Sequence, residues 1–159
     1  MASINNNLSE YNLENTPNSE GMRFAIIVSE WNENITNNLY NGAEQALLGN
    51  GVKKKDIVRI NVPGSFELVF GAKKASKDNY DAIICLGSVI KGETDHFHYV
   101  CNAVSCGIKD LNITLDIPVI FGVLTDNTEE EAINRSGGKH GNKGVEAAIT
   151  AIKMAHLNN

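Results

Sequence analysis

The chain has 159 residues, a length that suits one domain with a substantial core. It is 42% hydrophobic and 21% charged, as in ordinary globular proteins, and it has no apolar run long enough to cross a bilayer. The net charge of −5 argues against a nucleic-acid partner, because phosphate backbones are held by an excess of Lys and Arg. A small anion site remains open, since it needs only local positive charge.

The beginning of the chain and its cysteines bear on location. Residues 1–21 contain six Asn and little apolar periodicity, which predicts an N-terminal arm or tail followed by one domain over 22–159. No basic stretch with an apolar core follows the first Met, so we expect no secretory signal. Three cysteines without a C-x-x-C pair make a poor disulfide framework. Together these features predict a cytoplasmic protein that does not contact a membrane.

Short apolar runs alternate with helical patterns along the rest of the chain. The predicted strands are Phe24–Ser29, Ile57–Val62, Ala82–Ile90 and Val119–Leu124. They are nearly continuous apolar runs, as is typical of parallel strands buried on both faces. Helical stripes run from Ile35 to Leu47, Phe97 to Leu111 and Val145 to Ala155, and Thr128 with Glu131 forms a capping box. This order predicts an α/β domain with one parallel sheet covered by helices on both faces.

Polar residues follow each predicted strand, at the edge where such sheets bind ligands. Trp31, the only Trp, either packs a helix onto the sheet or stacks on a flat heterocycle. The turn of residues 63–67 also allows a structural and a ligand-binding interpretation. Ser65 caps the next helix, or the exposed amides and Glu67 bind a pyrimidine or a polyol.

Residues 87–94 have nearly the spacing of a nucleotide-binding G-x-x-x-x-G-K-[ST] loop, but Glu93 stands where the Lys belongs. A carboxylate there repels a triphosphate, although N–H groups before a helix starting near Asp95 still suit one phosphate. His96 and His98 point about 200° apart on a helix, so we expect no shared metal ion. His96 alone is either an acid/base candidate or structural.

A basic, glycine-rich stretch follows the capping box. Arg135, Lys139, His140 and Lys143 surround Ser136–Gly138 in an otherwise acidic chain. The stretch is either a solvated loop between two helices or a local anion site in which the Arg135 guanidinium binds phosphate.

From Phe24 to His156 the order of these motifs resembles the lumazine synthase family. The resemblance is carried by four blocks: Val62–Glu67, Leu86–His96, Pro118–Thr125, and Ala132–Lys139 with Gly141–Gly144. It implies a flavodoxin-like three-layer α/β/α fold with a four-stranded parallel sheet. It also implies a transferase that condenses 5-amino-6-(D-ribitylamino)uracil with 3,4-dihydroxy-2-butanone 4-phosphate. The products would be 6,7-dimethyl-8-ribityllumazine, phosphate and water, in the penultimate step of riboflavin biosynthesis.

The resemblance assigns roles to residues and needs no cofactor and no metal. The aminouracil would contact Trp31, Ser65, Phe66, Glu67, Ser88, Val89, Ile90 and, from a neighbouring copy, Phe121. The phosphate would be bound by Glu93, Thr94, Arg135 and Lys143, and His96 would transfer protons. Ser65 occupies a position that often holds Ala in the family, so its hydroxyl is an added hydrogen-bonding group.

The family also implies a homo-oligomer, a pentamer with sites between neighbouring subunits. The short connection from Arg135 to Lys143 predicts an icosahedral shell of pentamers, about 60 subunits in all, with riboflavin synthase as a candidate enclosed partner. One rival is a domain that binds FMN or acts as a phosphorylated receiver, yet residues 29–31 offer only one acidic group. The other is a shell protein without activity, which the joint presence of Trp31, His96 and Arg135 disfavours.

Overall fold

The computed structural model describes residues 7, 9–11 and 16–158. Its centre is a parallel sheet of four strands in the order β2-β1-β3-β4. The strands are β1 (Phe24–Ser29), β2 (Ile57–Val62), β3 (Ala82–Ile90) and β4 (Val119–Asp126). All four predicted strands are confirmed, and β4 continues two residues beyond its predicted end. Because β4 pairs only with β3 in this sheet, it is an edge strand.

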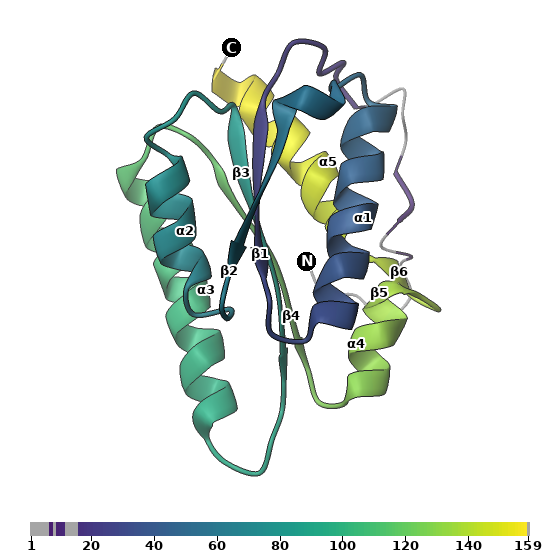
Figure 1. Ribbon diagram of the computed structural model, residues 1–159, viewed down its shortest axis with the longest axis vertical. Helices are drawn as coiled ribbons and strands as arrows, with labels where there is room; N and C mark the ends of the chain where they lie inside the picture. The colour runs from purple at the N-terminus through teal and green to yellow at the C-terminus, as the bar shows by residue number, and fades with distance from the viewer. Residues whose placement is uncertain (1–6, 8, 12–15, 159) are drawn as a thin grey trace.

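Helices cover both faces of the sheet, as Figure 1 shows, so the predicted three-layer α/β/α fold is confirmed. The helices are α1 (Glu33–Gly49), α2 (Leu68–Ala75), α3 (His96–Thr114), α4 (Glu129–Arg135) and α5 (Lys143–Ala155), with short 3-10 turns η2 (Lys54–Asp56) and η3 (His156–Asn158). Alternate residues of β1 serve the two layers: Ile26 packs with α1 and α5, and Ile27 packs with α2 and α3. No helix within the described residues is both long and apolar enough for a membrane span.

The capping box at α4 is present with one change of partner. The N–H of Glu131 donates to the Thr128 hydroxyl at 3.2 Å, as predicted. The Glu131 carboxylate accepts from the N–H of Asn127 at 2.7 Å, one residue before the cap. This cap fixes where α4 begins and therefore where its last residue, Arg135, is placed.

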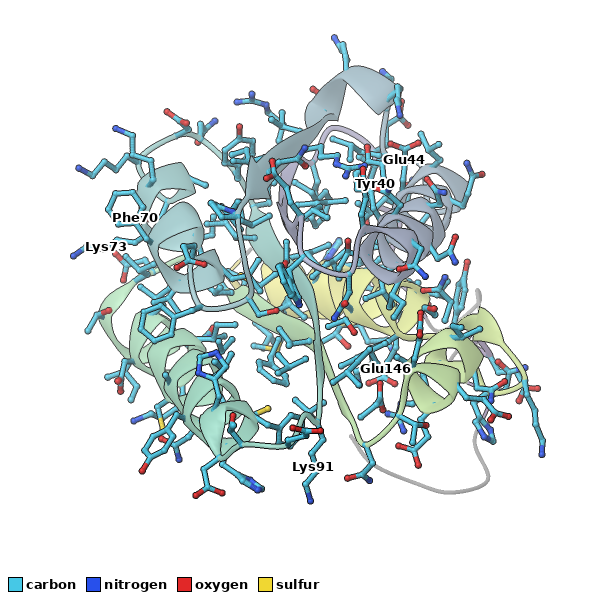
Figure 2. The ribbon with its side chains drawn as sticks, turned by 60° about the horizontal axis from the view of Figure 1, so that its bottom comes forward. Tyr40, Glu44, Phe70, Lys73, Lys91 and Glu146 are labelled. Atoms are coloured by element: carbon cyan, nitrogen blue, oxygen red, sulfur yellow. The ribbon has the colours of Figure 1, made fainter. Side chains whose placement is uncertain are left out.

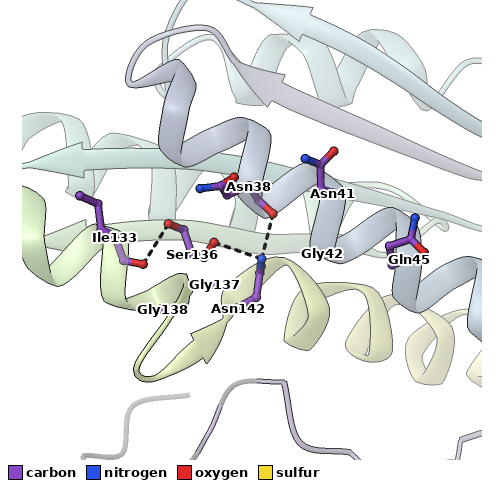
Figure 3. A pocket seen from close by; sticks show the side chains of 9 residues that line it. All are labelled: Asn38, Asn41, Gly42, Gln45, Ile133, Ser136, Gly137, Gly138 and Asn142. Carbon is purple, nitrogen blue, oxygen red and sulfur yellow. Dashed lines mark hydrogen bonds between the residues drawn. The ribbon is translucent and has the colours of Figure 1, made fainter.

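The connection between α4 and α5 is an antiparallel hairpin, so the interpretation as a plain solvated loop was wrong. Its strands are β5 (Ser136–Gly138) and β6 (Gly141–Asn142). Gly137 and Gly141 have φ values of 123° and 81°, which L side chains rarely adopt. The Asn142 amide donates to the carbonyl oxygens of Asn38 and Ser136, which ties the hairpin to α1 (Figure 3). The hairpin therefore sets the distance between the two basic residues at its ends.

Candidate active site

Two backbone hydrogen bonds and one side-chain hydrogen bond join the carboxyl ends of the first three strands. The N–H of Glu30 donates to Val62 O at 2.8 Å, and that of Trp31 donates to Pro63 O at 3.2 Å. Asn32 adopts a left-handed conformation (φ 59°), and its side-chain amide donates to Ser88 O at 3.0 Å. Asn is among the few residues that tolerate this conformation. The segments after β1 and β2 and the end of β3 are thus held in fixed positions.

A cavity of about 420 Å³ opens beside these strand ends. We call it the aromatic cavity, and it is lined by Trp31, Pro63, Gly64, Ser65, Phe66, Glu67, Ser88, Val89, His96 and Val100. Trp31 is 71% exposed and Phe66 is 60% exposed. An indole left this far in solvent does not fasten a helix to the sheet, so the packing interpretation fails for Trp31. Two exposed rings at the rim of a cavity suit a flat ligand.

Two hydroxyl groups in this cavity lack partners. Ser65 Oγ and Ser88 Oγ are both buried, and neither finds a hydrogen-bond partner among the described residues. Leaving such a group unbonded costs about 1–3 kcal/mol, which marks both oxygens as binding points for a polar ligand. The prediction that Ser65 caps the next helix was wrong. Helix α2 begins at Leu68, whose N–H donates to the Ser65 carbonyl instead.

His96 reaches the same cavity from α3. It is the first residue of that helix, after Asp95, and its side chain is exposed. Because His96 and His98 lie two residues apart on a helix, their rings point to different sides, and only His96 is among the residues that line the cavity. The imidazole therefore lies in the same cavity as the aromatic rings and the two orphaned hydroxyls.

A second cavity, of about 730 Å³, runs along the open edge of β4. We call it the edge cavity. Phe121, Asp126, Arg135, Lys143 and Glu146 are among its lining residues. Phe121 points outward from the edge strand and is 37% exposed. The β5–β6 hairpin brings Arg135, which ends α4, and Lys143, which begins α5, to the same cavity.

The charges in the edge cavity are paired in two different ways. Lys143 Nζ donates to Glu146 Oε1 at 2.5 Å, and both side chains are largely buried. Glu146 is labelled in Figure 2, which shows the molecule with the bottom of Figure 1 turned forward. Arg135 Nε lies 3.8 Å from Asp126 Oδ1, a distance that permits ion pairing but is too long for a hydrogen bond. Lys143 is thus engaged within its helix, whereas Arg135 keeps hydrogen-bonding capacity.

Three predicted residues line neither of these two cavities. Ile90 is half-buried and packs against the core beside α1 and α5. Glu93 and Thr94 are exposed in the turn before α3. From the sequence, residues 125–126 were expected at the ligand-binding edge of the sheet but Asp126 was given no role, and Glu146 was missed. A single Asp after a strand resembles a turn residue, and the polar segment after β4 was the only signal for it.

A third cavity, between α1 and the β5–β6 hairpin, differs in character (Figure 3). Its described lining residues are amides, glycines, Ser136 and Ile133, and none of them ionises near neutral pH. Its described lining therefore offers no acid, base or counter-charge for proton transfer or for holding an anion.

The fold and the two cavities define a class: a flavodoxin-like α/β protein with exposed rings, an imidazole and a guanidinium in cavities at the strand ends and the open edge of its sheet. The family model described as 6,7-dimethyl-8-ribityllumazine synthase matches residues 21–159. Proteins named 6,7-dimethyl-8-ribityllumazine synthase in Christiangramia forsetii and Cytophaga hutchinsonii are 59% and 56% identical to this chain. The alignments cover 99% and 97% of this chain, and 95% and 97% of those proteins. The chain belongs to the 6,7-dimethyl-8-ribityllumazine synthase family, transferases of riboflavin biosynthesis.

Proposed function

We propose that the chain condenses 5-amino-6-(D-ribitylamino)uracil with 3,4-dihydroxy-2-butanone 4-phosphate at a site completed by two copies of the chain. The observation that carries this proposal is the division of the site residues. The aromatic cavity holds Trp31, Phe66 and the imidazole, whereas the edge cavity holds Phe121 and the cations. The described residues that line the two cavities do not overlap. A heterologous contact that places one cavity against the other completes a site at each contact.

The aromatic cavity binds the aminouracil in this proposal. Trp31 and Phe66 stack on the ring, and the orphaned hydroxyls of Ser65 and Ser88 bond to its polar groups or to the ribityl chain. Glu67 accepts from ring or hydroxyl donors. Val89 adds an apolar wall, and Ile90 supports it from the half-buried end of β3. Phe121 of the neighbouring copy covers the ring from the other side.

The edge cavity binds the phosphate of the ketone. A dianion near a chain of net charge −5 needs fixed local counter-charge, and Arg135 and Lys143 supply it. The planar guanidinium of Arg135 offers parallel donors that an ammonium lacks. Glu93 and Thr94 approach from the aromatic side, through the Thr94 hydroxyl and the backbone N–H groups that precede α3.

The reaction consists of proton transfers and the departure of one anion. The aromatic amine attacks the ketone and loses water to give an imine, and phosphate leaves by elimination. The second amine then adds to the remaining carbonyl carbon, and loss of a second water closes the ring. His96 transfers protons at neutral pH, which suits an imidazole. Arg135 stabilises the negative charge on the departing phosphate. Aligning both substrates in one site contributes several kcal/mol of the rate enhancement, more than any single group.

Assembly follows from the same division of the site. We propose a pentamer in which each contact forms one site, and a shell of pentamers with riboflavin synthase as the candidate enclosed partner. The tight β5–β6 hairpin supports the shell, because the prediction rests on a short connection between Arg135 and Lys143. Light scattering at neutral pH should report a particle much larger than a pentamer, and a lone pentamer would contradict the shell.

Removal of residues 1–21 tests whether the arm joins neighbouring subunits. The cytoplasmic location stays a prediction.

Steady-state kinetics test the assignment of the two cavities. Lumazine absorbance is followed with each substrate varied in turn. Trp31→Ala should raise KM for the aminouracil alone. Arg135→Ala should weaken use of the ketone phosphate about ten- to a hundredfold, with Arg135→Lys in between, because charge-assisted bonds contribute about 1.5–3 kcal/mol. If Arg135→Ala leaves competition by inorganic phosphate unchanged, the anion lies elsewhere, and Lys139 or Lys143 becomes the better candidate.

A further inference from the structure

A buried carboxylate and a partly exposed guanidinium face each other in the edge cavity without a hydrogen bond. Asp126 ends β4, and its side chain is 8% exposed. Its Oδ2 is buried without a hydrogen-bond partner among the described residues, and so is Arg135 Nε. The nearest approach of the pair, from Nε to Oδ1, is 3.8 Å. A small movement of the Arg135 side chain, which is 32% exposed, closes this gap to a hydrogen bond.

Within the described residues, the ion pair with Arg135 is the one recorded interaction of the Asp126 carboxylate. The backbone carbonyl of Asp126 accepts from the N–H of Lys91 at 3.0 Å, a bond that any residue at this position can make. Burial is the main cause that raises the pKa of the Asp126 carboxyl above its usual value, while Arg135 lowers it and Glu131 raises it. A buried carboxylate kept at such a cost is more common at functional sites than in plain structural positions.

We propose that Asp126 is a positioning residue: its carboxylate holds Arg135 by the Nε edge, which leaves both terminal amino groups of the guanidinium for the substrate phosphate. The proposal rests on the assignment of phosphate binding to Arg135 made above. A guanidinium has five N–H donors in a fixed plane, so a carboxylate on one edge determines where the other edge points. Arg135 ends a short helix, and without this contact its side chain samples several rotamers.

A positioning role and a bystander role for Asp126 predict effects of opposite sign. A bystander carboxylate close to an anion site repels the anion, so its removal strengthens phosphate binding. A positioning carboxylate orients the cation, so its removal weakens phosphate binding although a negative charge is lost. The direction in which phosphate affinity changes therefore distinguishes the two roles, whatever the size of the change.

The test compares Asp126→Ala and Asp126→Asn with the wild type in the full-length protein. The measured quantities are KM for each substrate, kcat, and the inhibition constant of inorganic phosphate. Asp126→Ala should raise KM for the ketone phosphate and the inhibition constant about tenfold, with KM for the aminouracil unchanged. Asp126→Asn, which keeps an acceptor oxygen, should shift both in the same direction by less. Unchanged or tighter phosphate binding in both variants would overturn the proposal.

Two controls complete the experiment. Glu131→Gln removes a neighbouring carboxylate but keeps the oxygen that accepts from Asn127, so phosphate binding should be unchanged or slightly tighter. In an Arg135→Ala background, Asp126→Ala should have no further weakening effect, because the carboxylate acts through the guanidinium. If Arg135→Ala alone leaves phosphate inhibition unchanged, the phosphate assignment itself fails. If Arg135→Ala weakens inhibition and the Asp126 variants do not, only the positioning role fails.

Discussion

Replacing Gly87 with Ala should distort the aromatic cavity where Ser65 lines it. Gly87 lies in β3, directly behind the turn that carries Ser65. A Cβ at this position would lie 2.6 Å from Ser65 Oγ and 2.9 Å from Leu68 Cδ1. Because ordinary contacts between such atoms begin near 3.4 Å, the Ser65 hydroxyl has to move by roughly 0.8 Å. The added methyl group therefore displaces Ser65, whose hydroxyl we assign to the aminouracil.

The expected size of the effect follows from this displacement. Extra volume in a packed core costs about 1–3 kcal/mol, and the melting temperature of a domain of this size falls by about 2–4 °C for each kcal/mol. A substrate-binding segment that is misplaced by about 1 Å can cost up to 10²-fold in rate. We expect kcat/KM for the aminouracil to fall about ten- to a hundredfold. KM for the ketone phosphate should change little, since Arg135 lies in the other cavity.

The assay is lumazine absorbance with the aminouracil varied, together with a thermal melt. Gly92→Ala is the matched control, because Gly92 lies just after β3 in the connection to α3 and a Cβ there meets no atom within 4 Å. Gly92→Ala should melt and bind the aminouracil like the wild type. If Gly87→Ala behaves like Gly92→Ala in both measurements, the turn at Ser65 does not depend on close packing against β3, and the reasoning is refuted.

Three further predictions concern single groups. His96→Ala should lower the rate about 10²-fold, near the low end for an acid/base residue, and leave the particle size unchanged. Full activity of this variant across the pH range would contradict a role of His96 in proton transfer. Thr128→Ala removes the α4 cap and should cost about 0.5–2 kcal/mol in urea unfolding; it should also raise KM for the ketone phosphate, since α4 ends on Arg135. Burial raises the pKa of the Cys85 thiol to about 12, so at pH 8 iodoacetamide should alkylate it only after unfolding. Equal labelling of Cys85 in the native and unfolded protein would contradict that burial.

The sheet could be predicted from the sequence because its strands are nearly continuous apolar runs. The end of β4 could not, because Thr125 and Asp126 are polar and their place in the strand depends on pairing with β3. The β5–β6 hairpin has strands of three and two residues rich in glycine, which leave no apolar period to detect. It forms through the contacts of Asn142 with α1, which only the folded chain reveals.

The candidate site was partly predictable for similar reasons. The side-chain chemistry of Trp31, His96 and Arg135 is known from the sequence alone, and it suits stacking, proton transfer and anion binding respectively. Their exposure decides between rival interpretations: the indole of Trp31 projects into solvent, which no pattern of neighbouring residues determines. The site residues are divided between two cavities because β4 lies apart from the aromatic cavity. The order of residues along the chain does not show how far apart two segments lie in the fold, so this division could not be predicted.

Subunit mixing tests the shared site most directly. One variant carries Trp31→Ala with His96→Ala, and the other carries Phe121→Ala with Arg135→Ala, so each has lost one cavity and kept the other. Each variant is assayed alone and after co-assembly in equal amounts. If a site takes one cavity from each of two copies, random mixing restores about a quarter of the wild-type sites. We therefore predict roughly a quarter of wild-type activity in the mixture and almost none in either variant alone. A co-assembled mixture no more active than its two parents would show that each site is complete within one chain and would contradict the account.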